Sequence, residues 1–198
     1  KGDVQWMTAA SGILHKEYQE AEYSKQGGPF QMVQLWVNLP AKDKMSTPKY
    51  QAITKAQMGR HELGDAGYVD VIAGNFQGEK GPANTFTPIE MYNLHLKKGG
   101  ETGFDLPADF NTALLVVEGS VRVNDSENVP LDHFALFKNE GERIVVRAEE
   151  DSIVLVLSGE PIDEPLTSYG PFVMNTQEEI QQAFDDYNRG KFGYLDED

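Results

Sequence analysis

Two residues with metal-binding side chains, His15 and Glu17, stand two positions apart near the start of the sequence. Residues i and i+2 of a β-strand point to the same face, so an extended segment here would turn an imidazole nitrogen and a carboxylate oxygen the same way. This mixed donor pair suits divalent metals such as Fe(II), Mn(II) and Ni(II). Two ligands do not complete a site, and on spacing alone a solvated or ion-paired couple is the commoner origin of such a pattern.

The remaining three histidines carry weaker signals. His95 and His133 fall in sequence that predicts strands, but neither has a histidine or carboxylate two positions away. We expect each of them to be partly buried beside a hydrogen-bond partner. His61 lies in the polar segment 59–64 and is expected to be solvated. The sequence contains no cysteine, so a metal ion would depend on histidine and carboxylate ligands.

The net charge of the sequence argues against two classes of binding partner. The 198 residues include 17 Lys and Arg against 32 Asp and Glu, which gives a formal net charge of −15 and a pI near 4.6. This charge repels nucleic acid and anionic membrane surfaces, and no apolar run approaches the roughly 18 residues of a membrane-spanning helix. We therefore expect a protein that binds neither nucleic acid nor membranes, and the acidic, cysteine-free composition favours a cytoplasmic location.

Short runs rich in Val, Ile, Leu, Phe and Tyr alternate with Gly and Pro, which is typical of an all-β protein. Seven runs predict the strands of a sandwich or barrel: 69–73, 89–96, 113–118, 120–124, 134–138, 144–148 and 153–157. Three more strands are predicted upstream, at 4–8, 12–16 and 32–37. A polar connection at 40–58 separates the two groups, and we place the domain boundary near residue 57.

The one strong helix is predicted at the C-terminus. Thr176 and Glu179 have the spacing of a capping box, in which each side chain accepts a hydrogen bond from the other residue's backbone. The residues that follow share one apolar face, namely Ile180, Ala183, Phe184 and Tyr187. We expect this face to dock across a sheet or onto the neighbouring unit. The two tryptophans, Trp6 and Trp36, are expected in the core, with a pocket for an aromatic substrate as the alternative.

Several sequence blocks together carry a family resemblance. The first runs from Gly2 to Glu17 and contains Gly-Asp-Val-Gln-Trp-Met-Thr-Ala followed by Gly-Ile-Leu-His-Lys-Glu. Further blocks are Gln-Leu-Trp-Val-Asn-Leu-Pro at 34–40, Val-Ile-Ala-Gly at 71–74, Gly-Glu-Pro-Ile at 159–162 and Gly-Pro-Phe-Val-Met-Asn-Thr at 170–176. In these blocks, which span nearly the whole chain, the sequence resembles the pirin family of the cupin superfamily.

Pirins are bicupins with one metal, usually iron, in the first barrel. The resemblance implies two jelly-roll β-barrels: an incomplete, metal-binding first barrel with its linker in residues 1–56, then a metal-free second barrel and a C-terminal helix in 57–198. It also implies that His15 and Glu17 are the last two of four protein ligands, with Fe(II) expected and Mn(II), Ni(II), Co(II) or Zn(II) as alternatives. The other two ligands would be histidines of an upstream His-Pro-His segment, which these 198 residues do not contain.

The activity implied by the resemblance is that of a metal-dependent dioxygenase that opens the ring of flavonols such as quercetin with dioxygen, a quercetin 2,3-dioxygenase. Glu17 would then also be catalytic, because a carboxylate beside the flavonol hydroxyl can take its proton. The alternative is a non-enzymatic, metal- or redox-responsive regulatory protein that binds a protein partner. A third interpretation is a purely structural role.

Overall fold

The computed structural model describes residues 2–195 and divides into two compact units. The first unit is built from the chain up to residue 6 together with residues 50–162. The second is built from residues 7–49 together with the chain from residue 163 onward. The chain thus passes between the units three times, and the domain boundary near residue 57 stays a prediction.

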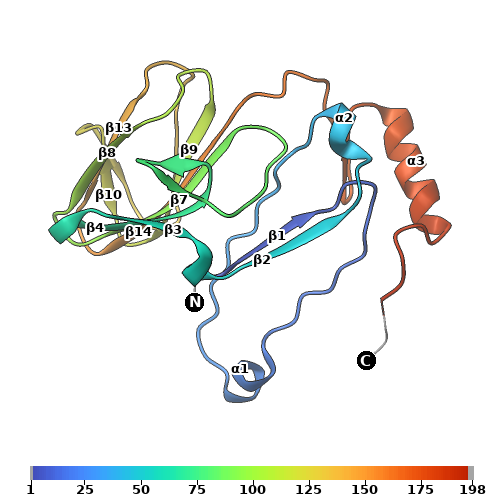
Figure 1. Cartoon of the computed structure of the whole chain (residues 1–198), viewed down its shortest axis with the longest axis horizontal. Coiled ribbons are helices and arrows are strands. Elements are labelled where there is room, and N and C mark those ends of the chain that lie inside the picture. The colour runs from blue at the N-terminus through green and yellow to red at the C-terminus, as the bar shows by residue number, and fades with distance from the viewer. Residues whose placement is uncertain (1, 196–198) are drawn as a thin grey trace. The chain divides into compact units, whose positions relative to one another are not determined.

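The first unit is an antiparallel double-sheet barrel of the jelly-roll type (Figure 1). One sheet has six strands in the order β12 (Phe134–Leu136), β9 (Asn111–Glu118), β14 (Ser152–Gly159), β7 (Ile89–Leu96), β4 (Gly67–Ala73) and β3 (Gly59–Glu62). The other has the order β11 (Glu127–Val129), β10 (Val121–Val123), β13 (Arg143–Ala148) and β8 (Glu101–Asp105). The short strands β5 (Asn75–Phe76) and β6 (Glu79–Lys80) pair with each other, and η2 (Gly64–Ala66) links β3 to β4. All seven strands predicted between 69 and 157 are present, so the all-β prediction is confirmed.

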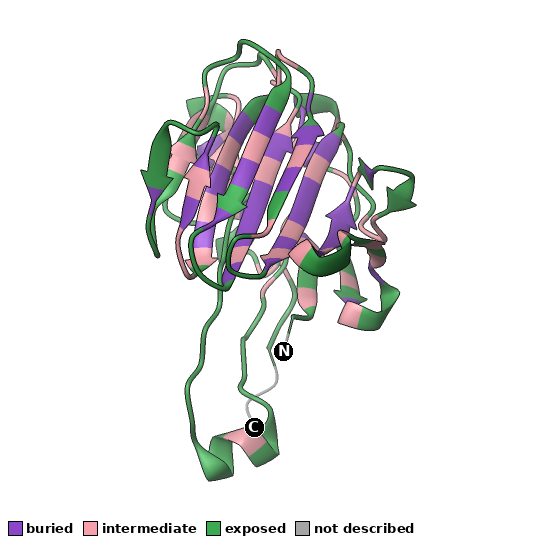
Figure 2. Ribbon diagram, turned by 90° about the vertical axis from the view of Figure 1, so that its left-hand side faces the viewer, coloured by how far each residue is buried: buried purple, intermediate pink, exposed green. Residues whose placement is uncertain are grey.

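Side chains alternate between the two faces of each strand, as the pleat requires. On β9, Leu114 and Val116 are completely buried inside the barrel, whereas Leu115 and Val117 lie on the outer face of the six-stranded sheet. Figure 2 shows this alternation as bands of buried and less buried residues along the strands. Apolar side chains fill the barrel, so the interior is a packed core.

The outer face of the six-stranded sheet is covered in part by residues 3–6 and 50–58, which we call the outer layer. It contains the start of β1 (Val4–Thr8), most of β2 (Lys49–Ile53) and η1 (Lys55–Gln57). Ile53 and Met58 are buried in a cluster with Ile72, Met91 and Leu155 of the sheet, and Trp6 packs against that cluster. Burying a side chain of this size contributes roughly 1.5–3 kcal/mol, so the layer is fastened mainly by apolar contact.

The second unit contains little regular structure outside its C-terminal part. That part is a hairpin of β15 (Thr167–Tyr169) and β16 (Phe172–Met174) followed by the helix α3 (Gln177–Asn188), and two shorter helices are α1 (Ala21–Gln26) and α2 (Ala41–Lys44). The predicted capping box is confirmed, because Thr176 Oγ1 accepts from the Glu179 amide and Glu179 Oε2 accepts from the Thr176 amide. Ile180 is buried, and α3 contacts both strands of the hairpin.

The strands predicted at 12–16 and 32–37 are wrong, because both segments are extended chain outside any sheet. An isolated strand gains no ladder hydrogen bonds and is not stable by itself, and among residues 2–195 neither segment has a strand beside it. Ile13 and the apolar side chains of 32–37 are consequently exposed, whereas Leu14 is half-buried. Trp36 is 65% exposed, so its predicted place in the core is also wrong.

Candidate functional site

Contacts within the second unit hold the segment that leads to His15. The Ser11 amide donates to the Ser46 carbonyl at 3.1 Å, and the Leu14 amide donates to the Phe192 carbonyl at 3.2 Å. Gly12 has a φ of +113°, and a Cβ at this position would lie 2.1 Å from Cε1 of Phe192. Only glycine fits such a conformation beside an aromatic ring. The backbone is therefore anchored on both sides immediately before His15.

His15 and Glu17 are both exposed on this segment. Glu17 Oε1 accepts a hydrogen bond from the side-chain amide of Gln34 at 3.2 Å, which links the two extended segments of the second unit. One imidazole and one carboxylate have the donor chemistry that Fe(II), Mn(II) or Ni(II) accepts. Between residues 2 and 195, however, no three His, Asp or Glu side chains gather closely enough to hold a metal ion. The donor types of the two residues suit part of a ligand set, and their assignment as metal ligands stays a prediction.

A buried lysine lies at the end of α2 in the same unit. Lys44 is 4% exposed, and its Nζ donates to Asn38 Oδ1 at 2.6 Å and to the Val173 carbonyl at 3.3 Å. Burial lowers the pKa of Lys44, and the nearby Glu164 and Glu179 carboxylates oppose that shift. The contacts tie the sequence before α2 to β16. Nothing in the sequence singles out Lys44, because a lysine in a polar stretch is usually solvated.

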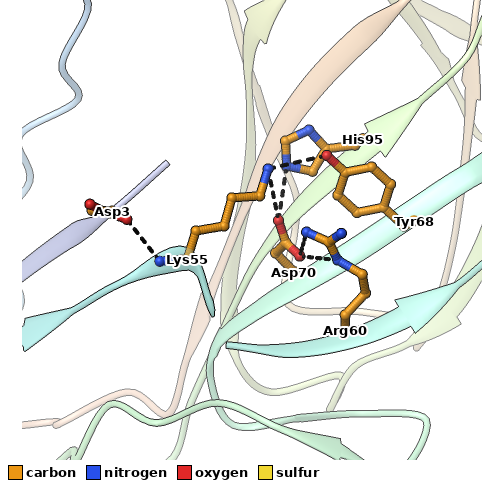
Figure 3. Close-up of polar contacts among 6 residues, drawn as sticks. All are labelled: Asp3, Lys55, Arg60, Tyr68, Asp70 and His95. Carbon is orange, nitrogen blue, oxygen red and sulfur yellow. Dashed lines mark hydrogen bonds and ion pairs between the residues drawn. The ribbon is translucent and has the colours of Figure 1, made fainter. Parts of the chain in front are cut away.

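A group of charged side chains lies in the first unit, between the outer layer and the barrel (Figure 3). We call it the Asp70 cluster, and it consists of Lys55, Arg60, Tyr68, Asp70 and His95. Asp70 is 2% exposed, which is rare for a carboxylate without compensating partners. Figure 3 shows cationic side chains meeting it from η1 and β3, with the His95 ring reaching it from β7.

The two oxygens of Asp70 have different partners. Oδ1 accepts from Arg60, with Nε and a terminal guanidinium nitrogen both at 2.8 Å. Oδ2 lies 3.5 Å from Lys55 Nζ and 3.4 Å from His95 Nε2. The hydrogen bond that Arg60 donates to Asp70 raises the pKa of Arg60. Burial lowers the pKa of His95, aided by the positive charges of Lys55 and Arg60 and opposed by Asp70 and Glu118.

Tyr68 completes the cluster as an aromatic platform. Its ring stacks on His95 at a centroid distance of 4.4 Å, and the Arg60 guanidinium carbon lies 4.1 Å from the ring centroid. Lys55 Nζ donates to the Tyr68 hydroxyl at 3.2 Å. His95 is thus partly buried beside a polar partner, as the sequence predicts. The cluster itself was missed, although an aspartate between two valines in a strand is a detectable signal of a paired buried charge.

The other two histidines lie apart from both groups. His61 belongs to β3 and its ring contacts Phe76 at a centroid distance of 5.4 Å, so its predicted place in a solvated loop is wrong. Pairing with β4 explains the difference, since His61 lies opposite the buried Val69. His133 stands just before β12, and its Nδ1 lies 2.8 Å from the Leu131 carbonyl oxygen. In contrast to the prediction of partial burial, His133 is exposed.

The double-sheet barrel and the segment before it define the class of protein. Residues 91–193 match the family described as the pirin C-terminal cupin domain, and residues 1–37 match the family described as pirin. These matches confirm the predicted cupin fold. The chain belongs to the pirin family.

Named relatives resemble the chain over nearly its whole length. A Pseudomonas aeruginosa protein named "Putative quercetin 2,3-dioxygenase" is 47% identical over 192 residues, which cover 96% of this chain and 67% of that protein. Pirin-1 of Arabidopsis thaliana is 38% identical, over 98% of this chain and 67% of that protein. The crystal structure of a quercetin 2,3-dioxygenase from Acinetobacter baumannii superimposes with a TM-score of 0.94 at 45% identity, covering 98% of this chain and 68% of that one. The chain therefore spans about two thirds of the length of these relatives.

Within residues 2–195, no helix has both the length and the apolar character needed to cross a bilayer.

Proposed function

We propose that the chain contributes to a metal-dependent dioxygenase that opens the ring of flavonols such as quercetin, with His15 and Glu17 as two of the metal ligands. The observation that supports this most directly is the similarity to the Acinetobacter baumannii quercetin 2,3-dioxygenase, which extends over 98% of the chain at 45% identity. Both candidate ligands lie inside the N-terminal segment that matches the pirin family. The remaining ligands would be supplied by sequence outside these 198 residues.

The chain's own residues have distinct roles in this proposal. A bound metal, Fe(II) in the first instance, supplies open coordination positions for the substrate oxygen and for dioxygen. His15 acts as a ligand through its imidazole. Glu17 acts as a ligand and as the base that takes the proton of the flavonol hydroxyl. Gln34 donates to Glu17 Oε1 and so orients the carboxylate.

The second candidate function is that of a metal- or redox-responsive regulatory protein. It is favoured by the apolar side chains that the second unit exposes on its extended segments, among them Phe30, Met32 and Trp36. Contiguous exposed apolar surface marks contact sites for other proteins. A net charge of −15 would favour a basic patch on the partner.

Oxygen uptake distinguishes the two functions. A protein that contains this chain together with the remaining ligands is loaded with Fe(II), bound metal is measured by elemental mass spectrometry, and oxygen consumption is followed after quercetin is added. We expect flavonol-dependent uptake that disappears together with the metal in His15→Ala. His133→Ala, at an exposed histidine of the other unit, should retain both. A protein that binds the metal stoichiometrically without consuming oxygen would refute the dioxygenase and leave the regulatory role.

A further inference from the structure

Lys55 connects the outer layer to the barrel through both its backbone and its side chain. Its amide donates to Asp3 Oδ1 at 2.8 Å, which joins the two segments of the layer. Its side chain leaves the layer and reaches Asp70 and Tyr68 of β4 (Figure 3). In the Asp70 cluster, Lys55 is the cation that does not belong to the barrel sheet itself. Its ion pair with Asp70 is therefore an electrostatic contact between the layer and the barrel.

Lys55 and His95 share one oxygen of Asp70, so the contact between Lys55 and Asp70 depends on the protonation state of His95. Arg60 uses Oδ1 through two short contacts, whereas Lys55 and His95 both face Oδ2 at 3.5 and 3.4 Å. When the imidazole is neutral, Arg60 and Lys55 are the cations that balance the negative charge of Asp70. A charged imidazolium would place a third cation on the same carboxylate, and it would compete with Lys55 for one oxygen atom.

We propose that His95 is a pH-dependent release for the outer layer: when its imidazole gains a proton, it displaces Lys55 from Asp70 Oδ2, and the layer loosens from the barrel. Arg60 and His95 are fixed on strands of the six-stranded sheet, whereas Lys55 lies on the short helix η1. When His95 and Lys55 compete for Asp70 Oδ2, Lys55 is therefore the residue that moves. The proposal concerns the first unit alone and does not depend on the proposed metal site.

The charges around His95 set the direction of this response. Asp70 and Tyr68 face it from β4, Arg60 from β3, Lys55 from η1 and Glu118 from β9. Burial and the two basic residues outweigh the two carboxylates, so the pKa of His95 lies below its ordinary value of 6.5 while the layer is closed. Opening removes Lys55 and admits water, and both changes raise the pKa of His95 again. Protonation therefore favours the open layer as the pH falls through this raised pKa.

Hydrogen exchange of the layer tests the proposal. The reporter amides are those of Lys55, which donates to Asp3, and Met58, which donates to the Lys55 carbonyl. Exchange is measured on the 198-residue protein at about pH 7.5 and about pH 5, on either side of the ordinary histidine pKa of about 6.5, and corrected for intrinsic rates. We expect protection of these amides to fall at the lower pH. The fall should be about tenfold for each unit by which the pKa of His95 in the open layer exceeds its pKa in the closed layer. Amides of β14 in the same barrel should change little.

His95→Gln removes the titrating group and should remove the pH dependence. His133→Gln is the matched control, since His133 is exposed and lies outside the Asp70 cluster, and it should behave as the unmodified protein does. Should His95→Gln fail to fold, imidazole NMR on the unmodified protein gives the answer, because the His95 titration and the shifts of the layer amides should share one midpoint. Exchange that is independent of pH, an unchanged pH dependence in His95→Gln, or separate midpoints would overturn the proposal.

Discussion

Gly12 lies against the ring of Phe192, so close that a Cβ on Gly12 would stand 2.1 Å from Cε1 of the ring. The next hydrogen bond along the chain reinforces this contact, because the Leu14 amide donates to the Phe192 carbonyl. Gly12 is also the glycine of the Gly-x-x-His segment that ends at His15. The glycine therefore has a structural role that is visible in this chain, namely to let the segment pass beneath an aromatic ring from the C-terminal part of the same unit.

Gly12→Ala should accordingly detach the His15 segment from Phe192. A residue other than glycine at this φ costs roughly 1–3 kcal/mol, and the backbone or the ring must also move to relieve the overlap. We expect the Leu14 amide to lose its protection against hydrogen exchange, while the barrel of the first unit keeps its own protection. Hydrogen exchange followed residue by residue by NMR measures both effects in one sample.

Gly27→Ala is the control for backbone strain alone. Gly27 also has a positive φ, +68°, but nothing lies within 4 Å of its missing Cβ. This variant should leave Leu14 protected. Equal loss of protection at Leu14 in both variants would show that the contact with Phe192 is unimportant.

The Asp70 cluster predicts an unequal effect of removing two aspartates. Asp70 is 2% exposed, and Asp70→Asn removes the buried carboxylate that pairs with Arg60 and Lys55. The loss of charge-assisted hydrogen bonds should destabilise the first unit by roughly 1–3 kcal/mol. Asp105 is the matched control, because its ion pair with Arg143 is exposed on both sides. Asp105→Asn should cost less than about 1 kcal/mol. Urea unfolding of both variants measures the difference, and equal costs would mean that Asp70 is no more than a surface charge.

The buried Lys44 predicts a pH dependence in the second unit. Burial lowers the pKa of this lysine below its ordinary value of 10.5, so the unfolded chain binds its proton more tightly than the folded chain does. The free energy of unfolding should therefore rise with pH between the lowered pKa and 10.5, by up to about 1.4 kcal/mol per pH unit from this group.

Comparison with Lys44→Met isolates this contribution, because the other titrating groups are common to both proteins. The difference in unfolding free energy, unmodified minus variant, should increase from about pH 7 toward about pH 10. A difference that is constant with pH would show that Lys44 titrates as an exposed lysine does. Lys42→Met, at an exposed lysine of the same helix, provides the control and should show no such trend.

The sequence predicts the barrel well because its strands carry their own signal. The run Ile89–Leu96 alternates and is bounded by turn residues, and β7 has the predicted limits. The strands predicted at 12–16 and 32–37 are absent because a strand also needs a partner, which no local pattern supplies. The Asp70 cluster escapes prediction for a related reason. Asp70 between two valines signals a paired buried charge, but its partners are brought together only by the pairing of β3, β4 and β7 and by the return of the outer layer.

The proposed roles of Glu17 as ligand and as base have separable consequences. Glu17→Gln retains the size of the side chain and one carbonyl oxygen but removes the group that takes the flavonol proton. We therefore expect flavonol-dependent oxygen uptake to fall by about 10²–10⁴-fold, the usual contribution of a general base. Bound metal, measured by elemental mass spectrometry on the same sample, should fall much less.

Glu22→Gln is the matched control, since Glu22 is an exposed carboxylate in the same unit whose side chain pairs with Lys25 at 2.7 Å. It should leave both oxygen uptake and metal content unchanged. If Glu17→Gln lowers uptake and metal content in the same proportion, Glu17 is a ligand only, and the base must be sought elsewhere. If it lowers neither, the carboxylate that Gln34 holds has no part in the reaction, and the assignment of His15 would then rest on its own variant alone.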